Sequence, residues 1–291
     1  MLWTAARSRH PRNVALAERL AEARRDSPES GTWLALLETA LDEGEPGGPW
    51  DALVPEPLGE RPLKAPLLFR VAITVDARMA GRWVRRLFTD APQAGGLRVD
   101  ALTMLASGLC QDEAVTEADP VRVVAQMAVL PLLRACGRRL AARLPPTWWE
   151  GYCPLCGAWP VVAEYLGLDR KRQLRCGRCA TAWAMPALRC VFCAEMDHER
   201  LGYLVSETGD PARRVEVCKT CKGYVKVLAT VRATPPWALP LDDLASVHLD
   251  VAALERGYAR PARPGHPLDA RITARRRSGL AASLGFGRTA L

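Results

Sequence analysis

Hydrophobic positions in the first half of the chain recur every three to four residues, the period of an amphipathic helix. The Pro- and Gly-rich segment 45–66 interrupts this pattern and predicts a loop. Ser27 with Pro28, and Asp119 with Pro120, suit the N-cap and first turn of a helix. We therefore expect an all-α domain with helices over residues 13–25, 27–42, 67–88, 97–110 and 120–143.

The pattern changes after Pro145 and Pro146, which close the helical domain. One amphipathic helix is expected near the C-terminus, over 239–258, with His248 packed on its apolar face. The other apolar runs are short and alternate with cysteine turns, as strands leading into metal-binding turns do. These predicted strands cover residues 160–165, 173–175, 201–206, 214–217 and 223–229.

Composition places the 291-residue chain among ordinary globular proteins, with 49% hydrophobic and 25% charged residues. The net charge of +8 suits nucleic acid, an acidic protein surface or an anionic membrane, and does not choose among them. The start of the chain lacks the apolar core of a signal peptide. Arginines and Pro131 interrupt the most apolar run, 121–144, so no membrane insertion is expected. We predict a cytoplasmic protein with reduced thiols.

Cysteine spacing carries the most specific chemical signal. Two thiolates held by a tight Cys-x-x-Cys turn make half of a tetrahedral metal site, so four turns make two sites. An interleaved grouping, first turn with third and second with fourth, stays open beside the simpler sequential one. In the sequential grouping the predicted ligands are Cys153, Cys156, Cys176 and Cys179 for one ion, and Cys190, Cys193, Cys218 and Cys221 for the other.

Four thiolates fill the coordination sphere of a tetrahedral ion and leave no position for water or substrate. Such sites are structural or transfer electrons, and both zinc and iron accept them. Metal binding, worth about 10–16 kcal/mol in zinc-finger peptides, would supply much of the folding free energy of this segment. Dithiol chemistry of the thioredoxin kind needs one pair in a βαβ setting, and four pairs at ribbon spacing argue against it.

Outside the four turns, no catalytic set is recognisable, so neither an enzyme nor a small-molecule substrate is predicted. Cys110 and Cys136 lie on apolar helical faces and are expected to be buried as small hydrophobic residues. His198 follows the third turn and is a candidate for a contact to a metal ligand. Asp242 and Asp243 are interpreted as a helix start, where negative charge is favourable.

Two further features have alternative interpretations. Trp148 and Trp149 precede the first cysteine turn and are either core residues at the domain junction or an exposed contact for a partner. The basic run 170–178 is either a solvated hairpin or an electrostatic face for nucleic acid or an acidic protein. Few aromatic residues lie among these basic residues, which disfavours nucleic acid because no stacking platform is evident.

The cysteine turns and the residues around them resemble the FdhE family, the formate dehydrogenase accessory proteins. The shared features are the order of the four cysteine pairs, Thr181-x-Trp183 after the second pair, Tyr224-x-Lys226 after the fourth, and the helix Asp242-Asp-Leu-Ala-Ser246. The resemblance covers about residues 150–258. The first half agrees in helical character and length only.

This resemblance implies two rubredoxin-like sites, with iron favoured over zinc, beneath a helical domain and without catalytic turnover. It implies assistance in the assembly or activation of respiratory formate dehydrogenase in the bacterial cytoplasm, through its catalytic subunit. The chain departs from the family at His248, which takes a usually apolar position, and from Ala259 onward, where an Arg-rich tail replaces a short end containing Asn-Pro-Phe.

The combined expectation is an α+β multidomain protein: an N-terminal all-α domain, two small rubredoxin-like (zinc-ribbon-like) four-cysteine β units, and a C-terminal helix. A zinc-ribbon nucleic-acid-binding protein and a rubredoxin-like redox protein are the alternative functions. The tail is expected to be disordered because it is basic and poor in apolar residues. The expected bounds are 1–148 for the helical domain, 149–187 and 188–234 for the two units, 235–258 for the helix and 259–291 for the tail.

Overall fold

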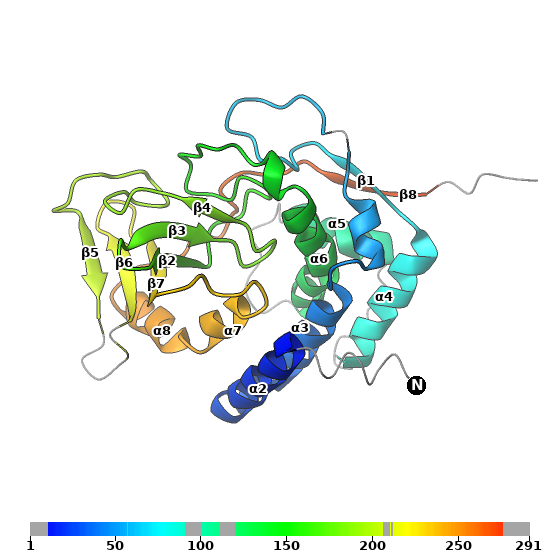
Figure 1. The fold of residues 1–291 in the computed structure, drawn as a ribbon, viewed down its shortest axis with the longest axis horizontal. Helices are drawn as coiled ribbons and strands as arrows, with labels where there is room; N and C mark the ends of the chain where they lie inside the picture. The colour runs from blue at the N-terminus through cyan, green and yellow to red at the C-terminus, as the bar shows by residue number, and fades with distance from the viewer. Residues whose placement is uncertain are drawn as a thin grey trace, which may run out of the picture.

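The structure of the protein is a computed structural model that describes residues 11–56, 58–90, 100–110, 120–205, 210 and 212–275. A bundle of helices stands beside a β-sheet, and two short helices lie against the sheet on its lower side in Figure 1. The bundle contains α2 (Pro11–Asp26), α3 (Gly31–Glu43), α4 (Ala77–Asp90), α5 (Ala101–Cys110) and α6 (Pro120–Arg139). Within the described residues, three short 3₁₀ helices accompany it, Pro28–Ser30, Pro49–Leu53 and Ala141–Arg143.

Helix α6 is the central element of the bundle and contacts α3, α4 and α5. It is apolar around most of its circumference, as expected for a helix enclosed by its neighbours. Helix α5 approaches it closely at Gly108, where an added Cβ atom would lie 2.1 Å from the carbonyl oxygen of Ala125. The helices expected over 13–25, 27–42 and 120–143 are present with shifted ends. Helix α5 corresponds to the helix expected over 97–110, whose first three positions lie outside the described residues.

The predicted helix over 67–88 is wrong in its first part. Residues Ala72–Val75 form a strand, β1, whose alternate side chains Ile73 and Val75 are buried. Helix α4 begins only after Asp76, whose Oδ1 accepts a hydrogen bond from the Met79 amide at 2.8 Å. The β-branched residues of this stretch favour an extended chain once a pairing strand is available, and that strand comes from the far end of the sequence.

The main sheet has six strands in the order β4-β3-β2-β7-β6-β5. Strands β2 and β7 pair in parallel, and every other neighbouring pair is antiparallel. The two expected β units are present as its halves, three strands each, and the β2–β7 pairing joins them into one sheet. The strands are β2 (Val162–Leu166), β3 (Lys171–Arg175), β4 (Ala182–Ala184), β5 (Leu201–Leu204), β6 (Arg213–Cys218) and β7 (Tyr224–Thr230).

The expected helix over 239–258 is two helices, α7 (Leu239–Leu244) and α8 (Val247–Glu255). The Ser246 hydroxyl donates to the carbonyl oxygens of Asp242 and Asp243, where the chain changes direction. Residues before and after this break no longer share one face. Leu249 and Ala253 are the buried residues of α8, and the predicted packing of His248 is wrong because its side chain is exposed.

The prediction of a disordered tail from Ala259 is wrong for residues 259–275. Leu268 and Ala270 are buried in the main core, and β8 (Arg271–Ala274) pairs in parallel with β1. A few apolar positions are enough to anchor a mostly polar segment when the core they enter is already formed, and average composition misses this. Residues 276–291 lie outside the described part of the chain.

One hydrophobic core runs from the helices into the first half of the sheet and includes the first four cluster cysteines. A smaller core, Val215, Val217 and Tyr224 with two residues of α8, lies under the second half. Among the described residues, no helix combines the length and the hydropathy needed to span a bilayer.

Candidate metal centres

The four Cys-x-x-Cys turns share one backbone geometry. In each turn, the amide of the residue after the second cysteine donates to the carbonyl of the first cysteine, at 2.9 to 3.2 Å. The amide of the first cysteine in turn donates to the carbonyl two residues beyond the second, at 2.8 to 3.0 Å. The residue after the second cysteine always has a positive φ: Gly157 (70°), Ala180 (63°), Ala194 (60°) and Lys222 (58°).

A left-handed conformation is costly for an L-residue, by roughly 1–2 kcal/mol. Gly157 is the one glycine among these four residues, and only glycine adopts this conformation without steric cost. Its occurrence at Ala180, Ala194 and Lys222 shows that the turn is imposed by its hydrogen bonds and by the convergence of the sulfurs, not by a glycine.

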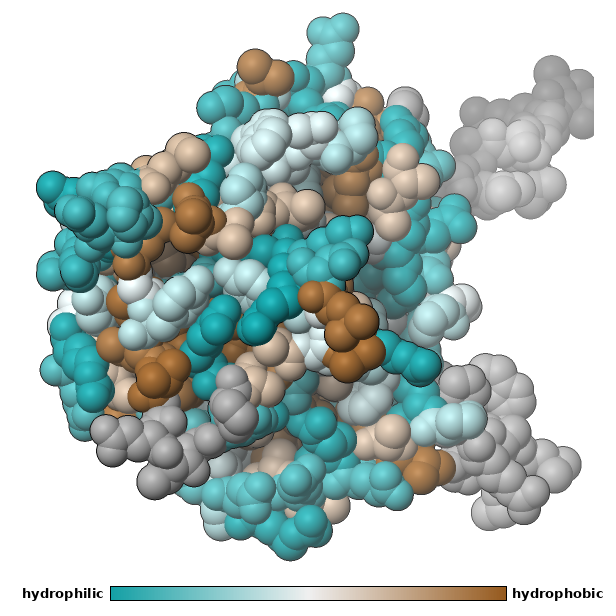
Figure 2. Space-filling model, turned by 60° about the vertical axis from the view of Figure 1, so that its left-hand side comes forward, coloured by the Kyte–Doolittle hydropathy of each residue, from teal (hydrophilic) through white to brown (hydrophobic). Residues whose placement is uncertain are grey.

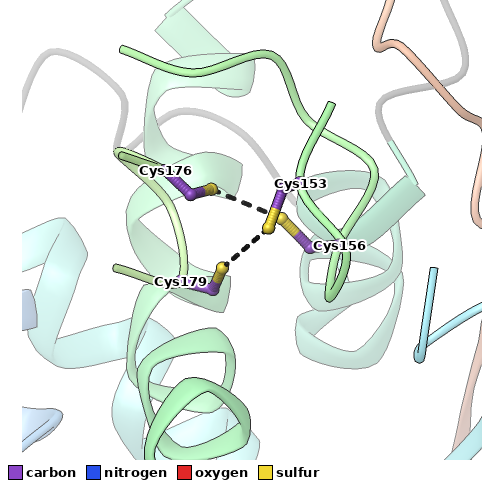
Figure 3. Close-up of side chains that lie close together, drawn as sticks. All are labelled: Cys153, Cys156, Cys176 and Cys179. Carbon is purple, nitrogen blue, oxygen red and sulfur yellow. Dashed lines mark hydrogen bonds between the residues drawn. The ribbon is translucent and has the colours of Figure 1, made fainter. Parts of the chain in front are cut away.

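The first cluster lies where the turn before β2 meets the turn between β3 and β4, and its four sulfurs point toward a common centre (Figure 3). The Cys153 and Cys179 sulfurs are 3.5 Å apart, as are those of Cys156 and Cys176, and all four lie within 4.8 Å of one another. Metal–sulfur bonds of about 2.3 Å in a tetrahedron place sulfurs about 3.8 Å apart, whereas a disulfide requires about 2.05 Å. The donor set and its size therefore fit a tetrathiolate ion.

The second cluster has the same form. Sulfur–sulfur distances are 3.7 Å for Cys190 with Cys221 and 3.7 Å for Cys193 with Cys218. Amide groups also point at the sulfurs, from Phe192 to Cys190 at 3.4 Å and from Gly223 to Cys221 at 3.3 Å. The structure thus brings the sulfurs together in the sequential grouping and not in the interleaved one.

The two clusters differ in their exposure. All four cysteines of the first cluster are at most 2% exposed. In the second, Cys190 and Cys218 are buried, but Cys193 and Cys221 are exposed. Burial raises the pKa of the Cys153 and Cys179 thiols, so a cation is needed to hold the buried set as thiolates.

Helix α6 supplies a positive charge beside the first cluster. The guanidinium of Arg134, 6% exposed, donates to the carbonyl oxygens of Gly177 at 3.2 Å and Pro236 at 2.6 Å. Burial lowers the Arg134 pKa to about 10, which leaves the group protonated at neutral pH, and negative charge on Cys179 and Cys176 favours that charge. Four thiolates around a divalent ion would carry a net charge of −2, which Arg134 would offset in part. No pattern in the sequence indicates this role of Arg134.

The basic run between the first two turns is not a continuous surface. Arg172 and Arg175 are buried and pair with Glu216 and Glu164, each at 2.5 Å. Arg178 donates to backbone carbonyls of α5. Among the run's cations only the first two, at positions 170 and 171, are exposed. Neither a solvated hairpin nor an electrostatic face describes this segment.

A buried ionic network explains the motif residues around the second cluster. Lys226, whose side chain is 2% exposed, lies 2.5 Å from the Asp243 carboxylate and 2.7 Å from that of Asp250. Tyr224 donates to Asp250 at 2.8 Å, and Arg260 pairs with both carboxylates. Asp243 is thus more than a helix start: it fixes α7 and the beginning of the tail to β7.

The structure also tests the predictions for the cysteine, histidine and tryptophan residues outside the four turns. Cys136 is fully buried, as predicted, and burial raises its pKa to about 12, whereas Cys110 is only half-buried. His198 is exposed beside Asp197 at 4.0 Å, so no contact to a cluster sulfur is found within the described residues. Trp148 is half-buried and donates to a backbone carbonyl, and Trp149 is 55% exposed.

Together, the fold and the clusters define a class of protein: a helical bundle joined to a sheet that carries two preformed four-cysteine sites, one buried and one at the surface. Residues 188–264, which contain the second cluster, match the family described as the C-terminal domain of FdhE. The match covers this C-terminal part of the chain, about a quarter of its length.

Similar curated proteins carry the same family name. A protein named FdhE homolog from Aquifex aeolicus is 33% identical over 116 residues, which are 39% of this chain and 40% of that protein. Protein FdhE from Escherichia coli is 34% identical over 111 residues, 38% of this chain and 35% of that protein. The match spans about two fifths of these relatives. The crystal structure of the FdhE protein from Pseudomonas aeruginosa aligns with a TM-score of 0.48 and 23% identity, over 86% of this chain and 93% of that one.

Proposed function

We propose that the eight clustered cysteines bind two metal ions in tetrathiolate sites. The sulfur spacing, the four equivalent turns and the charge of Arg134 support this assignment. The chain positions the sulfurs through the turns, directs amides at them in the second site, and excludes water from the first. A bound iron supplies a one-electron couple and a bound zinc supplies only a cross-link. The family resemblance favours iron, although the geometry accepts either ion.

We propose further that the protein is an accessory protein for respiratory formate dehydrogenase. It binds the catalytic subunit in the cytoplasm and assists its assembly or activation, without turnover of its own. The FdhE C-terminal domain match over residues 188–264, with a complete four-cysteine cluster inside it, is the observation that carries this proposal.

A gene deletion tests the accessory role. Formate dehydrogenase activity in extracts of the deletion strain should fall to background while the enzyme's transcript stays at its normal amount. Wild-type protein and Cys110→Ser should restore activity, because Cys110 lies outside both clusters. The double variant Cys153→Ser/Cys176→Ser should fail. Normal activity in the deletion strain would contradict the proposal.

Direct binding requires its own measurement. Tagged protein should co-purify the catalytic subunit from wild-type cells, and the amount should fall for the cluster variant but not for Cys110→Ser. Loss of activity on deletion without any co-purification would retain an accessory role and remove the proposed partner.

A rubredoxin-like redox role is the second candidate, favoured by the exposure of Cys193 and Cys221. Sulfur ligands at the surface give an electron a short path to a partner. Reversible reduction with a change in the visible spectrum would support this role. Native protein that contains zinc alone would exclude it.

A further inference from the structure

Strand β5 forms one edge of the main sheet and, among the described strands, pairs only with β6. Beside it lies a cavity of about 160 Å³, between the strands of the second half and the segment 187–192. Its walls are mostly apolar. Part of the lining is formed by Cys190 and Cys218, the two buried cysteines of the second cluster. The cavity therefore borders the second cluster.

The rim of this cavity is unusually apolar for a protein surface. Leu188 and Tyr203 both line the cavity and are 60% and 47% exposed. Val205, directly after β5, is 70% exposed. Figure 2 turns the β5 side of the molecule toward the viewer and shows hydrophobic surface gathered at several places on that face. Single exposed apolar residues are normal, but apolar residues around a cavity mark an interaction site.

Two arginines give the cavity an electrostatic preference. Arg172 and Arg189 line it, and the Nε atom of each is buried without a hydrogen-bond partner among the described residues. Arg172 is neutralised by Glu216, but Arg189 has no ion pair within the described part of the chain. One positive charge is thus left over at the cavity, and two N–H groups there lack an acceptor.

We propose that this edge binds an extended, acidic segment of a partner polypeptide. The segment adds a strand to the free edge of β5, inserts one large apolar side chain into the cavity, and places a carboxylate against Arg189. Backbone pairing at a sheet edge with a pocket for alternate side chains is a recurring mode of peptide recognition. A cavity of about 150 Å³ accepts benzene, so 160 Å³ suits one aromatic or branched side chain.

The proposal deepens the proposed function, on which it rests for the identity of the partner: the segment belongs to the client enzyme's catalytic subunit. The surface itself is defined by this chain alone. It can be tested with peptides, independently of any formate dehydrogenase.

The binding experiment uses fluorescein-labelled ten-residue peptides and fluorescence anisotropy with the full, metal-loaded chain. One peptide contains a central Leu followed by two Asp, a second replaces the Leu by Ser, and a third replaces the Asp residues by Lys. The first should bind at least about tenfold more tightly than either of the others, because burial of one large side chain and one charge pair each contribute that much. Equal affinities for the three peptides would overturn the proposal.

Variants locate the site. Leu188→Ser/Tyr203→Ser should weaken binding of the first peptide at least about tenfold. The control Val251→Ser/Leu254→Ser changes equally exposed apolar residues on α8 and should leave binding unchanged. Arg189→Gln should reduce the preference for Asp over Lys without changing the preference for Leu over Ser. Unchanged metal content would show that these surface variants fold, and equal weakening by both double variants would refute the assigned position.

Other occupants have distinct outcomes. If β5 pairs with a second copy of the chain, the protein should sediment as a dimer that Leu188→Ser/Tyr203→Ser converts to a monomer, and the proposal would be wrong.

In the deletion strain, the same variant should fail to restore formate dehydrogenase activity, while the α8 control restores it. Full activity of the rim variant would reject the docking surface and leave the accessory role intact. Normal activity in the deletion strain would reject the accessory role, and the peptide result would still decide the surface.

Discussion

Gly137 in helix α6 gives the sharpest prediction about how the helical bundle supports the first cluster. An added Cβ atom would lie 2.2 Å from the carbonyl oxygen of Cys179, one of the cluster cysteines. Ordinary contact begins near 3.4 Å, so α6 and the second turn must separate by roughly 1.2 Å (3.4 minus 2.2). Gly137→Ala therefore forces the bundle away from the site that Arg134, one turn earlier, helps to neutralise.

The expected magnitude follows from two opposing effects. Replacing Gly by Ala within a helix stabilises by about 0.5–1 kcal/mol when space allows. Overpacking against a backbone atom costs about 1–3 kcal/mol and exceeds that gain. Gly81 in α4 is the matched control, since its added Cβ would meet only the end of the Arg85 side chain at 3.5 Å. We expect Gly81→Ala to stabilise and Gly137→Ala to destabilise. Because the helix gain is common to both variants, their stabilities should differ by the overpacking cost, about 1–3 kcal/mol.

Urea unfolding of the zinc-loaded protein at a fixed free zinc concentration measures this difference, because bound metal adds to the apparent stability. Release of zinc to a chromogenic chelator provides the second readout, and Gly137→Ala should accelerate release from the slower site. A Gly137→Ala variant as stable as Gly81→Ala, with unchanged release, would refute the close packing of α6 on the cluster.

Three further predictions follow from burial and charge. An excess of chelator should remove one metal per chain quickly and the other slowly. Two cysteines of the second cluster are exposed, whereas all four cysteines of the first cluster are buried. Release of both metals at the same rate would contradict this prediction. Lys226→Met should lower the free energy of unfolding by about 3 kcal/mol, because it leaves carboxylates without their buried partner, whereas the exposed Lys171→Met should have almost no effect. Burial raises the pKa of Cys136 to about 12, so fewer than about one Cys136 thiol in a thousand is ionised at pH 8. Cys136 should therefore resist iodoacetamide in the folded protein. Rapid alkylation, detected by mass spectrometry, would contradict its burial.

Local patterns in the sequence predicted the parts of the structure that depend on local geometry. The helical period located most of the bundle, and the Cys-x-x-Cys spacing located the four turns and their simplest grouping. Both signals arise within a few residues of chain. The left-handed residues at Ala180 and Ala194 escaped prediction because the turn's hydrogen bonds, not the residue type, require that conformation.

Long-range pairing accounts for the errors. The parallel pairing of β2 with β7 joins the two halves of the sheet. The sequence of neither strand indicates which strand it pairs with. The same holds for β1 and β8, which pair across about two thirds of the chain length. Arg172 and Arg175 belong to a basic run in the sequence, but their partners Glu216 and Glu164 draw them into the interior. Only the fold reveals that these charges are neutralised.

Metal analysis of protein purified without oxygen, at native expression, tests the two tetrathiolate sites most directly. The account predicts two irons per chain with thiolate-to-iron charge-transfer bands in the visible spectrum, and one iron after Cys156→Ser or Cys190→Ser. Two zincs without colour would contradict the assignment of iron while preserving both sites. Metal-free native protein, with all eight clustered cysteines reacting as free thiols, would contradict the central claim.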